Sequence, residues 1–591
     1  MIFHPLRQLI PVALVLVSSL AAPSAKTADS AGRPGFLDPD AAVRERLTDP
    51  LVPSFRDCLA QRPDDSVKFW VFFTDKEVRN KADFQRAATS IRLTERATNR
   101  RAKVGLNRVV FADLPVSTSY ISEIEALGAR HRRSSRWLNA ATFIARPDVV
   151  ENISRLPYVS EVRPVSRYRR APEPIDETRP VPQEGGESVH ALNYGVSFNQ
   201  LNQIGVPAVH DLGYSGQGVT LAILDTGARR AHQYFAAAYA EGRVLAEYDF
   251  INDDTNVDYE AANGDFSSQP NHGTQVWGVA GGIADGFLYG PAYGANFIIC
   301  KTEDIRSEMP VEEDNWVAAM EFSDSIGADV LTSSLGYLDF DDSCGCNYTY
   351  ADMNGLTAIS SVAASMADSL GIVVTKSAGN EGPGAGTITA PADAFDILAV
   401  GAVDSNGLIA GFSSRGPTSD NRIKPEVCAR GVSTITAHPT SLNTYAAGSG
   451  TSFAAPLVGG AACLVIEAHP DWSPRRVREA LKMSGTMAGA PDNTYGWGII
   501  KVDSAIRVDF GCCSGRVGDV NGLGGDVPTI GDVTMLIDFL FISLIPPACL
   551  AEADINQSGG ANPQEGDISI GDVTQLIDHL FIAQLPLPFC I

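Results

Sequence analysis

Short apolar runs alternate with helical patterns through the middle of the chain. The apolar runs comprise residues 219–224, 297–299, 330–331, 372–374 and 397–400. The clearest helical patterns between them are residues 316–326 and 354–369. A short run without polar positions is typical of a strand that is buried on both faces. Alternating strands and helices predict an α/β fold, in which helices cover both faces of a parallel sheet.

A different pattern precedes the α/β part. Aromatic and β-branched residues at 67–73 predict a strand, and a charged helical pattern then extends to about Arg101. Further on, the pattern predicts, in order, a strand at residues 137–145, a helix at 149–156 and a strand at 158–162. These elements indicate a small α+β domain, which ends before a basic, proline-rich stretch.

The C-terminal region contains an internal duplication. Residues 530–542 recur as residues 570–582, a period of about forty residues. In each copy the apolar residues have helical spacing, and an acidic loop precedes the predicted helix. The loops offer closely spaced oxygen ligands of the kind that Ca²⁺ binds: Asp519, Asn521 and Asp532 in the first, and Asp554, Asn556, Ser558 and Asp572 in the second. The alternative is an apolar helical hairpin without metal.

Charge and the N-terminal sequence restrict the class of protein. The 591-residue chain is long enough for two to four domains, and its formal charge of −24 argues against a nucleic-acid binder. Residues 1–25 have a basic start, an apolar stretch and small residues at the end, which predicts a secretory signal. That stretch is too short for an ordinary membrane span, and no other stretch predicts one. We therefore expect a secreted protein.

The chain has ten cysteines, which is compatible with an oxidising compartment. Cys300, Cys428 and Cys463 stand in apolar surroundings, and we expect them to be buried as small hydrophobic residues. Four further cysteines near the C-terminus are candidates for stapling a small module: Cys512, Cys513, Cys549 and Cys590.

Three polar residues in the α/β part have the types that a nucleophilic enzyme requires. Ser452 stands among small residues before a predicted buried helix, His272 precedes Gly273, and Asp225 directly follows a predicted strand. A serine hydroxyl is a weak nucleophile unless a base accepts its proton and a carboxylate orients that base. The carboxyl ends of parallel strands are where catalytic groups gather, so Asp225 is well placed.

The motifs around these residues resemble those of the subtilisin-like (subtilase, S8) serine peptidases. They are Asp225-Thr226-Gly227, Asn271-His272-Gly273-Thr274 and Gly450-Thr451-Ser452-Phe453-Ala454-Ala455-Pro456, in the order Asp, His, Ser. The resemblance extends from about residue 194 to 508. It implies a subtilisin-like three-layer fold and a serine endopeptidase that cleaves peptide substrates. Ser452 would then be the nucleophile, His272 the general base and Asp225 the residue that orients His272.

The resemblance also suggests how the substrate is bound. In the motif Ser377-Ala378-Gly379-Asn380-Glu381-Gly382, Asn380 matches the residue that donates its amide to the oxyanion. Segment Ser333-Ser334-Leu335-Gly336 matches the family's substrate-pairing segment, and with Gly379 it would frame the pocket for the substrate side chain. Asn271, which precedes His272, departs from the family pattern. Trp277 also departs from it, because the family usually has a small residue at that position. The long acidic loops at residues 252–269 and 338–351 are predicted to be solvated surface, and the alternative is that they bind Ca²⁺ in the peptidase domain or shape the cleft. None of these features removes a catalytic atom.

Two further resemblances concern the flanking regions. Residues 26–170 resemble the inhibitory propeptide of secreted subtilases, which acts as an intramolecular inhibitor; the alternative is an unrelated α+β domain. Residues 509–591 resemble a dockerin, a module with EF-hand-like Ca²⁺ loops. Here both loops exceed the usual twelve residues, and Asp replaces the usual Glu at the last position. A dockerin implies a cohesin partner, often in complexes that degrade polysaccharides.

The predicted organisation follows from these observations. A signal (1–25), an inhibitory propeptide domain (26–170), a linker (171–193), a peptidase domain (194–508) and a calcium module (509–591) make up a secreted pre-pro-enzyme. The alternative is a calcium-dependent docking or adhesion scaffold whose subtilase domain is inert. The intact set of Asp225, His272, Asn380 and Ser452 argues against that alternative.

Overall fold

A computed structural model shows how most of the chain folds. The described residues are 44–78, 80–106, 108–165, 167–168, 175–176, 190–306, 311–336, 348–510, 513, 517–521, 528–547, 549–560, 563–582 and 587–588. The predicted signal and most of the predicted linker lie outside these residues.

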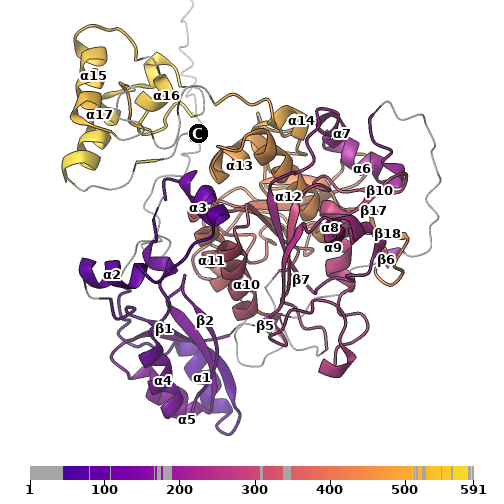
Figure 1. Ribbon diagram of the computed structural model, residues 1–591. Coiled ribbons are helices and arrows are strands. Elements are labelled where there is room, and N and C mark those ends of the chain that lie inside the picture. The colour runs from indigo at the N-terminus through magenta and orange to yellow at the C-terminus, as the bar shows by residue number, and fades with distance from the viewer. Residues whose placement is uncertain are drawn as a thin grey trace, which may run out of the picture. The chain divides into compact units, whose positions relative to one another are not determined.

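A sheet of seven strands forms the centre of the α/β part (Figure 1). The strand order is β16-β15-β14-β13-β7-β11-β8, and all neighbours run parallel. The strands are β7 (Thr220–Asp225), β8 (Val244–Asp249), β11 (Asn296–Lys301), β13 (Val330–Ser333), β14 (Val373–Ser377), β15 (Leu398–Val403) and β16 (Val427–Arg430). The five predicted strands are β7, β11, β13, β14 and β15, so the parallel sheet is confirmed.

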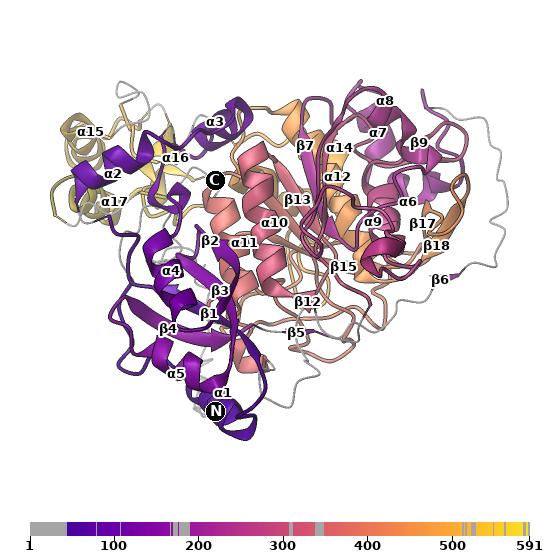
Figure 2. The same ribbon diagram turned by 60° about the horizontal axis from the view of Figure 1, so that its bottom comes forward.

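Helices cover both faces of this sheet. Alternate residues of β7 enter two separate cores: Leu221 and Ile223 pack with α9 (Asn271–Gly281) and α12 (Thr451–Ala468). On the other face, Ala222 and Leu224 pack with α10 (Glu313–Ile326) and α11 (Ile359–Ser369), which lie side by side (Figure 2). The three-layer arrangement of the predicted fold class is therefore confirmed.

Helix α12 is the central helix of its layer. Among the described residues it alone is long and apolar enough to span a bilayer, with a mean hydropathy of 1.5, but 89% of that stretch is buried in the protein. Its neighbour α9 carries the unusual Trp277, which is buried and stacks on Phe235 at 3.8 Å between ring centroids. A large aromatic residue is therefore accommodated where the family usually has a small one.

Shorter elements complete the α/β part. The helices are α6 (Phe198–Gln203), α7 (Val206–His210), α8 (Ala236–Ala240), α13 (Pro474–Met483) and α14 (Val502–Ala505). The hairpin strands are β9 (Ile283–Ala284), β10 (Leu288–Tyr289), β17 (Thr434–Ala437) and β18 (Tyr445–Gly448). Cys300, Cys428 and Cys463 are buried free thiols in this part, as predicted.

The region before the α/β part has its own sheet and core. Four antiparallel strands lie in the order β2-β3-β1-β4, and α1, α4 and α5 pack on one face of this sheet. The elements are α1 (Pro53–Gln61), β1 (Val67–Phe73), α2 (Lys81–Ala88), α3 (Glu95–Ala102), α4 (Thr118–Ala126), β2 (Arg130–Ser135), β3 (Ala140–Ala145), α5 (Pro147–Ser154) and β4 (Val159–Pro164). The predicted α+β character of this region is confirmed.

Two short strands follow this domain and pair with the α/β part. Strand β5 (Arg167–Tyr168) runs antiparallel to β12 (Val311–Glu312), which directly precedes α10. Strand β6 (Ile175–Asp176) runs antiparallel to β18. The segment after the α+β domain is therefore joined to the α/β part by main-chain pairing at two places.

The duplicated C-terminal region forms a separate small core. Its helices are α15 (Ile530–Phe541), α16 (Leu550–Ala553) and α17 (Ile570–Ile577), and a π-helical turn extends α17 to Ile582. Equivalent residues of the two copies, Val533 with Leu536 and Val573 with Leu576, are buried in this core. Cys513 and Cys549 are disulfide-bonded. The two predicted helices are thus present and pack in corresponding ways.

Several element boundaries differ from the prediction, including these three. The strand expected at residues 137–145 begins only at Ala140, because Asn139 adopts a left-handed turn conformation with a φ of 48°. The helix expected at residues 354–369 begins at Ile359, after a turn in which the Asn354 side chain accepts main-chain N–H groups. Asp225 is the last residue of β7 and does not follow it.

Candidate active site

The carboxyl end of β7 and the start of α9 bring an acid and a base together. Asp225 is the last residue of β7 and is buried, and His272 is the second residue of α9. The distance between His272 Nδ1 and Asp225 Oδ1 is 2.6 Å. The same carboxylate oxygen accepts the main-chain N–H of Thr226 at 2.7 Å, which fixes the orientation of the carboxylate.

Close main-chain contact sets this acid–base geometry. The N–H of Gly273 donates to Thr226 Oγ1 at 2.9 Å. A Cβ on Gly273 would lie 1.9 Å from the carbonyl oxygen of Gly227, a distance that no side chain allows. Gly227 itself has a φ of +99°, which favours glycine. The two glycines of the sequence motifs therefore let α9 start directly against the end of β7.

Ser452 lies at the start of α12. Its Oγ donates to the carbonyl oxygen of Ser334 at 3.2 Å, and Ser334 Oγ donates to the carbonyl oxygen of Ser452 at 2.9 Å. The ring of the next residue, Phe453, lies 6.2 Å from the ring of His272, so the start of α12 is next to the acid–base pair. As the second residue of a helix, Ser452 has a main-chain N–H that no helical carbonyl accepts.

Asn380 is held against the start of α12. Its Oδ1 accepts the N–H and the hydroxyl of Thr451, both at 2.9 Å. Because a main-chain N–H can only donate, this contact identifies the amide oxygen, and Nδ2 is the donating atom on the other side of the amide. The structure thus brings together the four predicted catalytic residues: Asp225, His272, Asn380 and Ser452.

The predicted substrate segment presents its main chain. Ser333 Oγ accepts the indole N–H of Trp316 at 2.9 Å, and Leu335 is buried in the core beneath α10 and α11. With Ser334 bonded to Ser452, the side chains of residues 333–335 are all engaged by the protein. The segment can therefore offer a substrate its main-chain N–H and C=O groups, which form hydrogen bonds with the main chain of an extended peptide.

One residue beside the predicted pocket glycines was not predicted from the sequence. A Cβ on Gly336 would lie 2.6 Å from Thr389 Oγ1, and one on Gly379 would lie 2.8 Å from the same atom. Thr389 is therefore in contact with both predicted pocket glycines. It is buried, and among the described residues its hydroxyl has no hydrogen-bond partner. A lone threonine between Ile388 and Ala390 carries no signal in the sequence.

Three carboxylates of the α/β part lie close enough to bind one metal ion. Oxygen atoms of Asp249, the last residue of β8, and of Asp254 and Glu260 in the acidic loop that follows lie within 4.8 Å of one another. Asp249 also accepts an ion pair from the buried Lys301 at 2.8 Å. That lysine supplies positive charge which a metal ion would otherwise provide.

The second C-terminal loop gathers its predicted ligands. Asp554 Oδ1 accepts the N–H of Ser558, and Asp572 Oδ1 accepts the N–H of Asn556, both at 2.9 Å. Burial raises the pKa of Asp554, and the neighbouring Asp572 carboxylate adds to this effect. A bound cation would relieve both effects, so these residues fit Ca²⁺.

The first loop has a corresponding arrangement. Asp532 Oδ1 accepts the N–H of Asn521 at 2.9 Å, and Oδ2 accepts the N–H of Thr529 at 2.7 Å. Asp519 lies just upstream and is buried. In both copies the aspartate therefore fixes the loop and also caps the helix that follows it.

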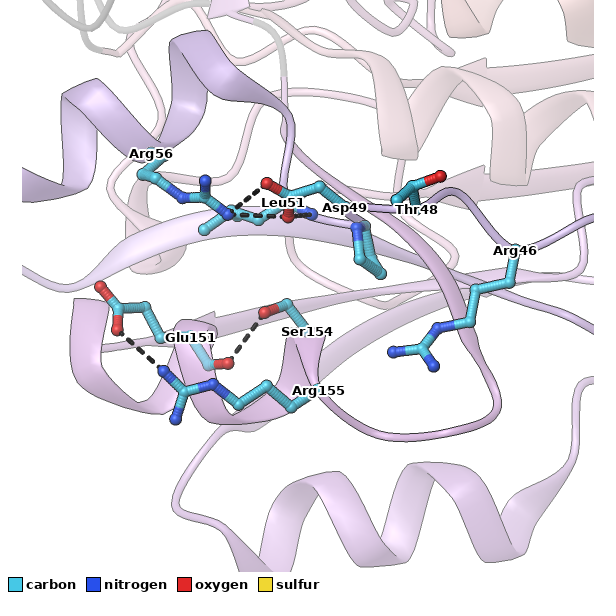
Figure 3. A pocket seen from close by; sticks show the side chains of 9 residues that line it. Arg46, Thr48, Asp49, Leu51, Arg56, Glu151, Ser154 and Arg155 are labelled. Atoms are coloured by element: carbon cyan, nitrogen blue, oxygen red, sulfur yellow. Dashed lines mark hydrogen bonds and ion pairs between the residues drawn. The ribbon is translucent and has the colours of Figure 1, made fainter.

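A surface pocket of about 430 Å³ lies in the α+β domain, beside α1 and α5 (Figure 3). Its charged residues pair locally: Arg56 contacts Asp49 at 2.7 Å, and Arg155 contacts Glu151 at 3.6 Å. None of the residues that line it belongs to the catalytic set, and we assign it no function.

Comparisons with known proteins agree with this geometry. The profile of the subtilase family matches residues 216–498, and that of the peptidase S8 propeptide domain of Bacteroidota matches residues 68–177. Subtilisin E of Bacillus subtilis (strain 168) is 30% identical over 388 residues, which cover 65% of this chain and 85% of the relative. Subtilisin of Bacillus pumilus is 32% identical over 321 residues, covering 54% and 99%.

A solved structure is similar in fold. Fervidolysin from Fervidobacterium pennivorans, a keratinolytic enzyme related to subtilisin, superposes with a TM-score of 0.52 at 20% sequence identity. The superposition covers 75% of this chain and 61% of that protein. At this identity the likeness concerns the fold alone.

Proposed function

Since this chain belongs to the subtilase family of serine endopeptidases, we propose that Asp225, His272 and Ser452 are the residues with which it hydrolyses peptide bonds. The observation that supports this assignment most directly is the 2.6 Å contact between His272 Nδ1 and Asp225 Oδ1, beside the start of the helix that carries Ser452. In an acid–base pair of this geometry the other ring nitrogen, Nε2, is the atom that transfers the proton.

The first half of the reaction forms an acyl-enzyme. Ser452 Oγ attacks the carbonyl carbon of the substrate, and its proton passes to His272 Nε2. Asp225 stabilises the imidazolium through Nδ1–H. The new oxyanion accepts hydrogen bonds from Asn380 Nδ2 and from the N–H of Ser452. His272 then gives the proton to the leaving nitrogen, and the C–N bond breaks.

The second half regenerates the enzyme. A water molecule gives a proton to His272 and attacks the ester carbonyl, and the same two donors hold the oxyanion. The bond from the carbonyl carbon to Ser452 Oγ breaks, and Oγ recovers its proton from His272. The C-terminal product leaves as a free amine in the first half, and the N-terminal product leaves as an acid in the second.

The propeptide domain acts as an inhibitor within the same chain. Strand β5 lies at the end of this domain and pairs antiparallel with β12, with Tyr168 opposite Val311. Strand addition of this kind is how an extended peptide substrate would also bind. In our proposal β12 is an edge at which an extended substrate also pairs, in addition to residues 333–336, and the end of the propeptide occupies this edge until the chain is cut.

Export is part of the proposal. It is supported by the signal-like sequence at residues 1–25 and by the disulfide-bonded state of Cys58, Cys513 and Cys549. Disulfides persist in oxidising compartments and are rare in the cytosol. The enzyme therefore works outside the cell on protein or peptide substrates.

Residues 509–591 are assigned to attachment through a dockerin-like module. Asp519, Asn521 and Asp532 would hold one Ca²⁺, and Asp554, Asn556, Ser558 and Asp572 a second. When bound, Ca²⁺ would neutralise these carboxylates and fix each loop to its helix. Equivalent apolar residues of the two copies, Phe541 and Phe581, are exposed and would meet a cohesin-type partner.

Peptide hydrolysis by matched serine variants tests the catalytic assignment. Ser452→Ala is expected to abolish both the removal of the N-terminal region and the cleavage of casein. Ser449→Ala is the control, because it makes the same change in the same segment, where Ser449 Oγ accepts the N–H of Ser433. Equal activity of the two variants would exclude Ser452 as the nucleophile.

A further inference from the structure

Two arginines of the propeptide domain are buried against the α/β part. Arg100 and Arg101 lie in the last turn of α3 and are 1% and 0% exposed. Arginine is almost never fully buried unless its charge is paired. Helix α3 contacts α10, so these two residues lie at an interface between the propeptide and the peptidase domain.

Arg100 binds the carboxyl ends of two helices at once. Its Nε donates to the carbonyl of Leu370, just after α11, at 3.1 Å. Its Nη1 donates to the carbonyl of Ala328, just after α10, at 2.9 Å, and its Nη2 to the carboxylate of Asp324. Carbonyls at helix ends carry partial negative charge, and the planar guanidinium has donors in a fixed fork. A lysine could not make all three contacts in this geometry.

Asp324 is the centre of the surrounding charges. Arg101 contacts it at 2.8 Å and Arg136 at 3.0 Å, in addition to Arg100. Burial alone would raise the pKa of Asp324, but these three guanidinium groups hold it below its usual range. The propeptide domain supplies all three arginines, and the peptidase domain supplies Asp324 on α10. The two domains therefore bring opposite charges to the interface.

The helix ends are shaped to receive α3. Gly327 follows α10 with a φ of +104°, and a Cβ there would lie 2.4 Å from Arg96 Cβ. Gly371 follows α11 with a φ of +94°, and a Cβ there would lie 3.0 Å from the carbonyl oxygen of Arg100. Thr94 Oγ1 also donates to the carbonyl of Ser325 at 3.2 Å. The absence of side chains at the two glycines lets the main chain of α3 lie directly on the helix ends.

We propose that the carboxyl ends of α10 and α11, with Asp324, form a guanidinium-binding site whose ligand is Arg100 of the chain's own propeptide, and that this site holds the propeptide on the enzyme after cleavage. The inference rests on the proposed function only in that the propeptide is cut from the enzyme. The pairing of β5 with β12 is a separate contact, which a competing substrate strand can displace. The guanidinium site lies elsewhere and does not compete with substrate, so it sets how fast the cut propeptide leaves.

The test follows release of the propeptide without using the enzyme's own activity. In full-length Ser452→Ala protein, a recognition sequence for an added site-specific protease is placed within residues 181–186. After cleavage and dilution, size-exclusion chromatography measures how long the N-terminal fragment stays bound. The variants are Arg100→Gln, which removes the charge, and Arg100→Lys, which keeps it. Arg92→Gln is the control, because Arg92 is an exposed arginine just before the same helix and takes no part in the contacts described above.

We expect the half-life of the complex to fall about tenfold or more for Arg100→Gln and about fivefold for Arg100→Lys, since contacts of a charged group are lost, and to stay unchanged for Arg92→Gln. If the Arg100→Lys complex has the same half-life as the control complex, the inference is overturned. Because Arg100→Lys keeps the charge, it also provides the test if Arg100→Gln does not fold. Peptide hydrolysis is measured in parallel on protein that retains Ser452. This assay tests the proposed function independently of how long the propeptide stays bound.

Discussion

The amide of Asn380 gives the sharpest test of the catalytic geometry. Its Oδ1 is held by the N–H and the hydroxyl of Thr451, so its Nδ2 is oriented before a substrate arrives. Asn380→Leu keeps the size of the side chain but removes the donor. We expect kcat to fall about a hundred- to a thousandfold, the range known for loss of one oxyanion donor from subtilisin, with little change in KM.

Thr451 provides a graded control for this prediction. Thr451→Val removes the hydroxyl contact but keeps the main-chain one, and a net hydrogen bond is worth about 1 kcal/mol, so kcat should fall about fivefold. Thr451→Ser keeps the hydroxyl and should remain close to wild type. In our interpretation Thr451 acts by orienting Asn380, so Thr451→Val should cost nothing further once Asn380→Leu is present.

The assay is steady-state hydrolysis of a peptide anilide, with active enzyme counted by titration of Ser452. Two results would contradict this role of Asn380 and Thr451. A fall of less than about tenfold for Asn380→Leu would mean that Nδ2 is not a principal oxyanion donor. A double variant in which the two losses multiply in full would mean that Thr451 acts independently of Asn380.

Three further predictions concern the pocket, acid stability and metal. Thr389→Gly opens the space between Gly336 and Gly379, so kcat/KM should rise for substrates with large apolar side chains relative to small ones, measured on a matched peptide series. Burial lowers the pKa of His210 to about 4, so the unfolded chain binds a proton at this residue before the folded protein does. The free energy of unfolding, measured by urea titration, should therefore fall by up to about 3 kcal/mol as the pH drops from about 6.5 to 4. In His210→Gln this contribution should be absent. A chelator should make the C-terminal module, but not the peptidase domain, sensitive to added trypsin; equal sensitivity with and without chelator would contradict calcium binding there.

The sequence revealed those parts of the site that depend on local patterns. The runs that became β7, β11, β13, β14 and β15 are apolar throughout because both faces of each strand are buried, so their number and their parallel arrangement could be predicted. Asp225 could be placed because a parallel sheet gathers polar groups at one edge. The two edge strands, β8 and β16, were not predicted. Strand β8 is only half-buried and carries Glu247 and Asp249 among its apolar residues, and β16 is only four residues long.

Other features depend on contacts between distant residues. Arg100 belongs to a charged helical pattern, and nothing near it in the chain indicates that its partners are Asp324 and the carbonyls of Ala328 and Leu370. Thr389 likewise becomes part of the pocket only through its contact with Gly336 and Gly379. A pattern along the chain reports burial and element type, but it does not report which buried surfaces meet.

The contact between Gly227 and Gly273 has a consequence for how this enzyme can change over evolutionary time. The position of the base relative to the acid is set by one peptide group resting on another, and not by the packing of side chains beneath α9. Large replacements such as Trp277 can therefore accumulate in the core without displacing His272 from Asp225. Substitutions of side chains in the helix layer should therefore be tolerated widely. Substitutions of these two glycines should not be, because a single added methyl group would separate His272 from Asp225.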